Sequence, residues 1–341
     1  MKPRYLIAAI AAAASVSAQA TDSINLGSYT VAGTYALDIL NGTSGGISGL
    51  EASAVAYARD RGTLFFVGDE GTGVIEISRT GQTLGNMTFD WSNTGSTKHD
   101  TEGLTYLGGG VLVVGEERLQ DAYRFTYATG GSASLAANSV SISNTNVGNN
   151  GMEGISFDPR NGSFVTVKQG NPSDPVTYPE GIYAGTLTFS AGLAGTTGTS
   201  TMTQLFDPAL MGLATLSDVQ TLSPVDALAG SAAADNLLVL SLGSKKLLEV
   251  NRLGQIMSSY DLSGILPGNA IEGVTIDEKG TIYLVAEQLQ DEYAVGITNP
   301  RSQLIVLSAP VPEPETYAMM LAGLGLLGVA ARHKREPRGT A

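Results

Sequence analysis

A short acidic motif recurs along the chain and constrains its fold more than any other feature. Three copies place Glu before Gly at the start of an apolar run, at 102–106, 153–157 and 272–276. Weaker copies begin at Glu51 and Asp218. The successive first acids are 51, 51, 65 and 54 residues apart. A period near fifty residues predicts a repeat architecture in which each unit is one supersecondary element.

Each motif is followed by further short strands that Gly-rich turns separate. In the first unit, runs at 54–57, 63–67, 74–77 and 82–89 fit a four-stranded antiparallel meander. Four strands in about forty residues are the usual content of one propeller blade. We therefore expect an all-β protein, a β-propeller with five blades of four-stranded antiparallel meanders. Six blades are the alternative if the long loops contain more strands.

The last unit predicts how the ring closes. It offers strands at 273–276, 281–286 and 302–308 and then no fourth strand. A strand pattern at 24–31 precedes the first motif and belongs to no unit. We expect this N-terminal strand to pair beside 303–307, because closure removes an exposed sheet edge. The fourth unit carries an insertion at 223–235.

The two ends of the chain read as export signals that flank a propeller domain at 21–309. Residues 1–20 have a basic start, an apolar run and a small-residue cleavage site, which predict a signal peptide. A membrane anchor is the alternative, although the run is short for a span. A Pro-rich linker at 310–316 precedes a tail at 317–341, in which an apolar run ends in a basic cluster. This tail predicts a short transmembrane segment with a cytoplasmic C-terminus.

Composition excludes several classes of function. The formal charge is −13 with 19 basic residues, which argues against nucleic-acid binding and suits cations. The sequence has no cysteine and two histidines, His99 and His333, of which the second lies in the tail. A Ser/His/Asp or Cys/His hydrolase is therefore not expected. The absence of cysteine also excludes disulfides.

The repeated acids predict a metal site. The first strand of a blade is normally innermost, so its acids should ring the mouth of the central channel. Acids at the ends of the second strands share this face, among them Asp69, Glu70 and Glu117. Crowded carboxylates raise one another's pKa, and a bound cation relieves the repulsion. Oxygen ligands favour Ca²⁺, and glycine after the acid would let backbone carbonyls approach the ion. The candidate metal ligands are Glu51, Glu102, Glu153, Asp218, Glu272, Glu116 and Glu287.

Other interpretations of these residues stay open. Each acid could instead accept hydrogen bonds from backbone amides of the neighbouring blade and act only as a turn residue. His99 is expected to be a loop histidine without chemistry, although it could be a base or ligand at the channel mouth. Lys168 could bind an anion or neutralise nearby acids. Trp91 could stack on a sugar, but packing within a blade is the commoner role.

The tail resembles a known sorting signal. The run Val-Pro-Glu-Pro-Glu at 311–315, the apolar stretch and the terminal Arg cluster are similar to the PEP-CTERM signal of Gram-negative bacteria. This resemblance implies recognition by an exosortase in the inner membrane, removal of the tail, and delivery to the cell envelope or extracellular matrix. A plain C-terminal membrane anchor is the alternative.

The body also resembles a family. The segments 100–106, 113–117, 151–155, 247–250 and 271–274 are similar to the SdiA-regulated (YjiK-like) propellers. The resemblance implies a β-propeller with a calcium site at the Glu-Gly acids and no established reaction. Ala52 after Glu51 and Val219 after Asp218 depart from the Glu-Gly pattern, so the five copies do not form a symmetric set.

These observations lead to one expected function and two alternatives. We expect an exported, calcium-binding propeller that binds a ligand or partner, such as a polysaccharide or envelope protein, at the bacterial surface. A metal-dependent hydrolase of phosphoesters or lactones, with Glu102 or Glu153 as base, is the first alternative. A purely structural matrix protein is the second, since a fold does not decide a function.

Overall fold

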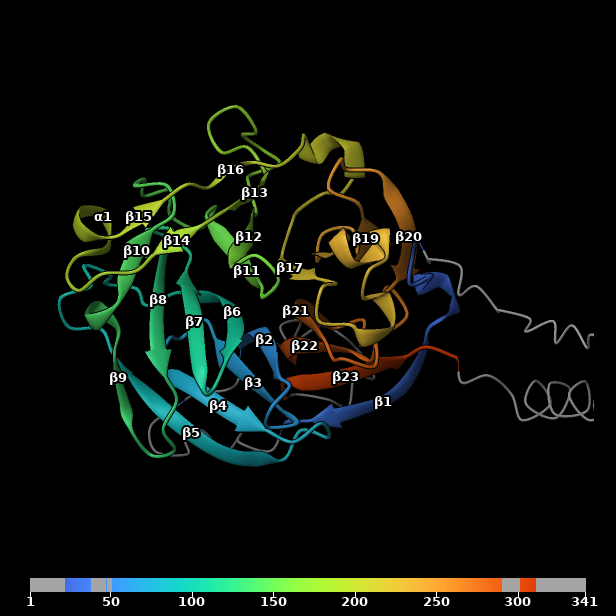
Figure 1. Cartoon of the computed structure of the whole chain (residues 1–341), viewed down its shortest axis with the longest axis horizontal. Coiled ribbons are helices and arrows are strands. Elements are labelled where there is room, and N and C mark those ends of the chain that lie inside the picture. Colours follow the sequence, from blue (N-terminus) through green and yellow to red (C-terminus); the bar gives the residue numbers. More distant parts are fainter. Residues whose placement is uncertain (1–21, 38–46, 48–50, 290–300, 311–341) are drawn as a thin grey trace, which may run out of the picture.

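The computed structural model describes residues 22–37, 47, 51–289 and 301–310. Five large sheets stand around a central axis, so the chain is a five-bladed β-propeller (Figure 1). The expected all-β class and number of blades are confirmed. The first strands of neighbouring blades pack against one another at the centre. The ring therefore brings equivalent positions of all five blades close together.

Four blades are meanders with the first strand innermost. Blade 1 contains β2 (Ala52–Ala58), β3 (Thr63–Gly68), β4 (Gly73–Ile77) and β5 (Thr83–Asp90). Blade 2 contains β6 (Thr101–Gly108), β7 (Val111–Glu116), β8 (Asp121–Thr126) and β10 (Ser139–Ser141). Blade 3 contains β11 (Met152–Asp158), β12 (Ser163–Lys168), β13 (Gly181–Gly185) and β16 (Thr203–Gln204). Blade 4 contains β17 (Asp218–Thr221), β18 (Leu237–Ser241), β19 (Lys246–Val250) and β20 (Ile256–Asp261).

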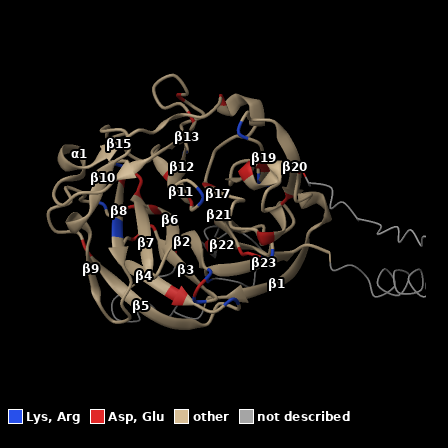
Figure 2. Ribbon diagram, viewed as in Figure 1, with Lys and Arg blue, Asp and Glu red and all other residues tan. Residues whose placement is uncertain are grey.

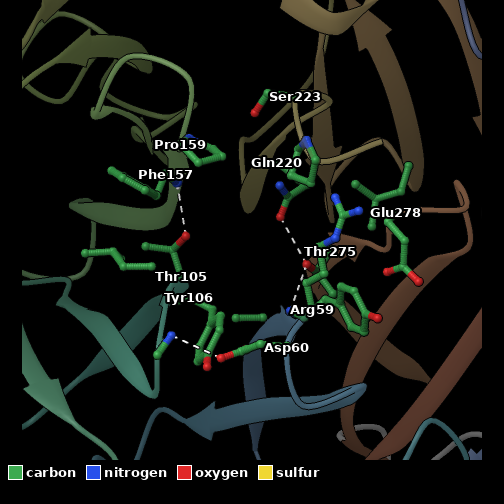
Figure 3. A pocket seen from close by; sticks show the side chains of 17 residues that line it. Arg59, Asp60, Thr105, Tyr106, Phe157, Pro159, Gln220, Ser223, Thr275 and Glu278 are labelled. Carbon is green, nitrogen blue, oxygen red and sulfur yellow. Dashed lines mark hydrogen bonds between the residues drawn. The ribbon is translucent and has the colours of Figure 1, made fainter. Parts of the chain in front are cut away.

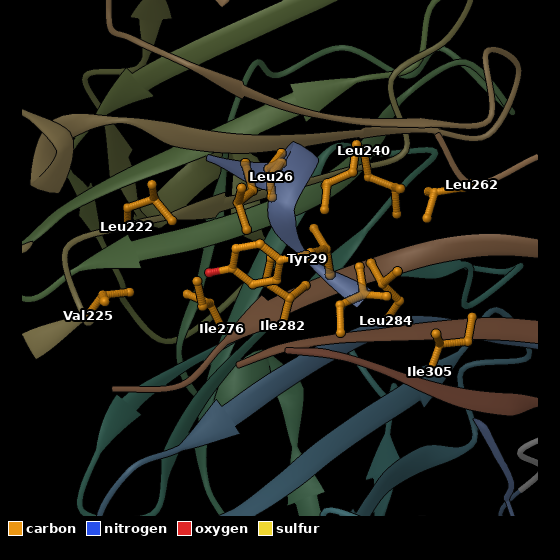
Figure 4. Packing of buried hydrophobic residues seen from close by; sticks show 14 of the residues in the cluster. Leu26, Tyr29, Leu222, Val225, Leu240, Leu262, Ile276, Ile282, Leu284 and Ile305 are labelled. Carbon is orange, nitrogen blue, oxygen red and sulfur yellow. The ribbon is translucent and has the colours of Figure 1, made fainter. Parts of the chain in front are cut away.

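Blade 5 joins the two ends of the described chain. Its strands are β21 (Asn269–Ile276), β22 (Ile282–Leu289), β23 (Gln303–Ser308) and the N-terminal β1 (Thr30–Ala36). Closure by an N-terminal strand is thus confirmed, but the predicted segment 24–31 is wrong in most of its length. Leu26–Ser28 forms a 3₁₀ turn, η1, and pairing with β23 begins only at Thr30. The turn forms because it buries Leu26 and Tyr29 between blades 4 and 5 (Figure 4).

In the described part of the chain, several short strands and helical turns are present in addition to the twenty strands of the five blades. Blade 1 gains an outer strand, β9 (Ser132–Ser134), which runs parallel to β5. In blade 3, β13 ends at Gly185, and the next strand, β14 (Leu187–Thr188), pairs separately with β15 (Thr199–Ser200). The predicted insertion at 223–235 is present and holds two 3₁₀ turns. The helical elements are η2 (Leu135–Ala137), α1 (Ala194–Thr197), η3 (Pro208–Met211), η4 (Asp226–Leu228) and η5 (Ala232–Asp235).

The core consists of five apolar wedges, one at each interface between neighbouring blades. Strand β3 shows why its sequence is apolar throughout. Leu64 and Phe66 face the wedge shared with blade 5, whereas Phe65 and Val67 face the wedge shared with blade 2. Side chains alternate along a strand, so a blade packed on both sides needs apolar residues at every position. Charged residues occur at scattered positions along the blades (Figure 2).

The predictions for the two ends lie outside the described residues. These are the signal peptide at 1–20, the linker from 311 onward and the tail at 317–341. Among the described residues, no helix has the length and apolar character that crossing a membrane requires.

Candidate metal centre

A β-bulge marks the Glu-Gly motif in three blades. In β6 the pairing with β7 skips Glu102, in β11 the pairing with β12 skips Glu153, and in β21 the pairing with β22 skips Glu272. A bulged residue is released from the ladder and can be aimed differently from its neighbours. The bulges therefore place the three acids at one end of the central axis, the acidic end.

The glycine after each acid makes room for the neighbouring blade. A Cβ atom on Gly154 would lie 2.3 Å from Asp218 Oδ1, and one on Gly273 would lie 2.8 Å from the carbonyl oxygen of Ser53. On Gly103 it would lie 3.0 Å from Ile155 Cγ2. The structure thus gives these glycines a packing role between first strands, whereas the sequence had suggested that they expose backbone carbonyls to an ion.

Carboxylates from blades 1, 2, 3 and 5 gather at the acidic end. Each of these carboxylates either raises the pKa of another one or belongs with another one to a potential metal-ligand group. We call this set the acidic cluster, and it comprises Glu51, Asp69, Glu70, Asp100, Glu102, Glu117, Glu153, Glu272 and Glu287.

Burial and mutual repulsion disfavour the charged forms of these acids. Burial first, and repulsion from Glu153 and Glu272 next, raises the pKa of Glu102 well above its ordinary value. The pKa values of Glu153 and Glu272 are raised in the same way. Burial, a hydrogen bond shared with Glu51 and repulsion raise the pKa of Asp69 to about 9. Positive charge at this end would relieve the repulsion and restore the carboxylate forms.

Asp69 belongs to both groups of carboxylates that could bind a cation. One potential ligand group consists of Glu51, Asp69 and Glu70, and a second of Asp69, Asp100 and Glu102. Within each group the ligand oxygens lie within 4.8 Å of one another. Asp69 Oδ1 is buried and has no hydrogen-bond partner among the described residues. An all-oxygen donor set with a buried, unsatisfied carboxylate oxygen fits a hard cation such as Ca²⁺.

Little basic charge reaches the cluster. Arg118 Nε lies 2.6 Å from Asp100 Oδ2. Among the described residues, this is the one ion pair that involves a member of the acidic cluster. One guanidinium does not neutralise so many carboxylates.

The predicted ligands divide into those within the cluster and those outside it. Glu51, Glu102, Glu153, Glu272 and Glu287 lie within it. In blade 1, the bulge falls at Ser53, so Ser53 is the structural counterpart of Glu102. Glu51 belongs to the cluster because its side chain shares a hydrogen bond with Asp69.

Glu116 and Asp218 have other partners. Glu116 accepts hydrogen bonds from Ser96 Oγ at 2.8 Å and the Leu119 amide at 2.7 Å, and the next residue, Glu117, joins the cluster. Asp218 accepts hydrogen bonds from the Val219 and Val274 amides, both at 2.7 Å. Asp218 thus ties blade 4 to blade 5, which is the turn-residue role that the sequence left open.

Four members of the cluster were absent from the predicted ligands: Asp69, Glu70, Asp100 and Glu117. Asp69, Glu70 and Glu117 were placed on the correct face, because they follow second strands, but the repeat pattern did not single them out. Asp100 precedes the motif by two residues and has no counterpart in the other copies. Its position depends on the path of the loop before β6, and the pattern of strands and turns in the sequence does not predict that path.

The sequence also singled out His99, Trp91 and Lys168, and the structure places these residues as follows. His99 stacks on Trp91, with ring centroids 4.9 Å apart, in the loop before β6. The Trp91 Nε1 atom donates a hydrogen bond to the Gly71 carbonyl at 2.6 Å. Lys168 lines a cavity of about 260 Å³ between blades 2 and 3, and burial lowers its pKa.

A sequence model of the SdiA-regulated family matches residues 31–288, which include all five motifs. The chain belongs to the SdiA-regulated family. A second model, the PEP-CTERM protein-sorting motif, matches residues 310–335. The SdiA-regulated propeller described here therefore carries a signal for export and for membrane-associated, exosortase-mediated sorting in Gram-negative bacteria.

Solved structures with a similar chain path align at low sequence identity. A luciferin-regenerating enzyme aligns with a TM-score of 0.45 and 9% identity, over 80% of this chain and 94% of that one. Virginiamycin B lyase from Staphylococcus aureus aligns with a TM-score of 0.39 and 11% identity, over 74% of this chain and 78% of that one. Similarities of this size do not transfer a function.

Proposed function

We propose that this protein is an exported, calcium-binding propeller that binds a ligand or partner in the bacterial envelope or extracellular matrix. The observation that carries the metal proposal is the sharing of Asp69 by two potential ligand groups at the acidic end. Glu51, Glu70, Asp100 and Glu102 complete these groups. Ca²⁺ takes about six to eight oxygen ligands, and the cluster supplies enough carboxylates to approach that number.

The charge of the cluster supports the same proposal. Nearby acids raise the pKa of Glu102, Glu153 and Glu272, so these side chains repel one another when ionised. A divalent cation would stabilise the ring by joining blades 1 and 2 through Asp69 and Asp100. When bound, Ca²⁺ would also supply positive charge at the acidic end for a ligand or partner.

Calorimetric titration of the chelator-treated protein with CaCl₂ tests the metal proposal. We expect a saturable heat signal that Asp69→Asn abolishes, because Asp69 belongs to both ligand groups. Asp226→Asn is the matched control, since Asp226 is an exposed acid of the insertion outside the acidic cluster. Wild-type calcium binding by Asp69→Asn would contradict the proposal.

Hydrolysis of a phosphoester or lactone at the same acids is the less supported alternative. His99, the histidine that the structure describes, stacks on Trp91 and lines a cavity together with Glu70. The acidic cluster itself offers carboxylates that could act as the catalytic base. Calcium-dependent turnover of p-nitrophenyl phosphate or of a γ-lactone that Asp69→Asn abolishes would establish the hydrolase in place of a binding protein.

A further inference from the structure

The end of the ring opposite the acidic cluster contains a cavity of about 570 Å³. All five blades contribute to its lining, from the positions where their first strands end (Figure 3). Its volume lies within the range of about 300–1,000 Å³ that is typical of small-molecule sites. The residues around it carry neither the dense negative charge nor the potential metal-ligand groups of the acidic end.

Polar side chains of fixed orientation line the inner part of this pocket. Thr275 Oγ1 accepts a hydrogen bond from the Tyr57 amide at 3.1 Å and donates one to Gln220 Oε1 at 3.0 Å. Thr105 Oγ1 accepts from the Phe157 amide at 3.0 Å. These bonds cross from one blade to the next and hold the hydroxyl and amide groups in place. Among the described residues, no acceptor takes the Thr105 hydroxyl hydrogen, so it can serve a ligand.

Aromatic rings form part of the pocket wall. Tyr106 packs one face on Phe65, with ring centroids 5.9 Å apart and an interplanar angle of 14°. Phe157 packs against Phe164 at 5.1 Å. Both residues line the cavity (Figure 3), and the Tyr106 ring is supported on one face by Phe65. Supported aromatic faces offer flat apolar surface at low entropic cost.

The charges at the rim are of both signs, and two of the charged side chains have partners. Arg59 Nη2 pairs with Asp226 at 2.8 Å, and Asp60 Oδ2 accepts a hydrogen bond from the Gly109 amide at 3.1 Å. Glu278 lies on the same side of the pocket as Arg59 (Figure 3). Because neither sign dominates, the rim selects against a strongly charged ligand.

We propose that this pocket binds a neutral sugar of one or two rings. The apolar face of a pyranose ring would lie against Phe157 or Tyr106, and its hydroxyls would bond to Thr105 and Gln220. A sugar combines flat apolar CH surface with many hydroxyls, which matches a wall of aromatic rings beside fixed hydroxyl and amide groups. The inference extends the binding role proposed above but does not depend on the metal.

Ligand-observed saturation-transfer NMR on the whole protein tests the sugar site. The probes are glucose, galactose, mannose, maltose and cellobiose, each titrated separately. We expect at least one to bind, and Phe157→Leu to weaken that binding about fivefold by removing the aromatic face. Phe189→Leu is the matched control, because Phe189 also packs against Phe164 but does not line the pocket.

The other outcomes overturn the inference. If no probe binds, the pocket is not a sugar site. Equal weakening by Phe157→Leu and Phe189→Leu, or by neither, would place binding elsewhere. Sugar binding by Asp69→Asn in the presence of chelator separates this site from the metal proposal, so either can fail alone. Thermal melting of each variant confirms that it is folded.

Discussion

Gly103, Gly154 and Gly273 each follow an acid, and each faces the first strand of the next blade. A methyl group on Gly154 would collide with the Asp218 carboxylate, and one on Gly273 would collide with the Ser53 backbone. A methyl group on Gly103 would pack tightly against Ile155. In blade 1 the corresponding position after the bulge is Ala54, also a small residue. The two residues of the Glu-Gly motif therefore have separate roles. The Glu places a carboxylate at the central axis, and the Gly allows close contact with the next blade.

Gly154→Ala should destabilise the protein by about 1–3 kcal/mol, the usual cost of overpacking. The new Cβ would lie 2.3 Å from Asp218 Oδ1 and 2.7 Å from Asp218 Cα, so the backbone must shift. Gly264→Ala is the control, since nothing lies within 4 Å of its Cβ position. Urea unfolding measures both variants, and equal stabilities would show that the inner strands are not tightly packed.

A buried acid outside the cluster predicts a pH dependence. Burial acts to raise the pKa of Asp158, but hydrogen bonds from Arg160 outweigh it and leave that pKa below its ordinary value. A depressed folded pKa contributes stability above the unfolded value of about 3.9 and loses it as pH falls through the folded pKa. Asp158→Asn should therefore be less stable than wild type at pH 7, and the difference should shrink below about pH 4. A difference that does not change with pH in unfolding experiments would contradict this account.

At the scale of elements, the N-terminal segment connects two blades. Glu249 of β19 is fully buried and accepts hydrogen bonds from Ser23 Oγ, the Ile24 amide, Asn236 Nδ2 and Ser258 Oγ. The chain then forms η1 over blade 4 and continues as β1 in blade 5. The closure of the ring thus has two parts, a side-chain anchor on one blade and a strand in the next.

Ser23→Ala should destabilise the protein by about 1.5–3 kcal/mol, because it removes a hydrogen bond to a buried carboxylate. Ser28→Ala, in the same segment, should change stability by less than about 0.5 kcal/mol, since its hydroxyl makes a local, exposed bond to the Asn25 carbonyl. Chemical unfolding compares the two. Similar effects would indicate that the anchor on Glu249 does not hold the ring closed.

At the scale of the whole molecule, the two ends of the central axis have different chemistry. One end gathers carboxylates from four blades, and the other holds a pocket of aromatic and hydroxyl groups. A ring of five blades can place residues far apart in sequence at either end without any contact within a single blade. The same architecture therefore supports a proposed metal centre and a proposed ligand pocket that act separately.

If the acidic cluster binds calcium as proposed, calcium at about 100 times its dissociation constant should raise the free energy of unfolding by about 2.7 kcal/mol, because a ligand that binds only the folded state stabilises it. The gain should be absent in Asp69→Asn and should disappear when a chelator is added. Thermal melting with and without CaCl₂ measures it. A calcium effect of equal size in wild type and Asp69→Asn would locate the binding site outside the acidic cluster.

The sequence alone determined the repeat, the number of blades, the closure of the ring from the N-terminus and the presence of several motif acids at one end. The repeat and its strands follow from local patterns, because strand alternation and turns between neighbouring strands are encoded within about fifty residues. The closure follows from the missing fourth strand of the last unit. Only the tertiary structure decided which carboxylates meet. Asp69, Glu70, Asp100 and Glu117 join the cluster, whereas Glu116 and Asp218 bond to nearby hydroxyl or amide groups. Such contacts depend on bulges, loop paths and the distance across the axis between blades, which no single repeat specifies.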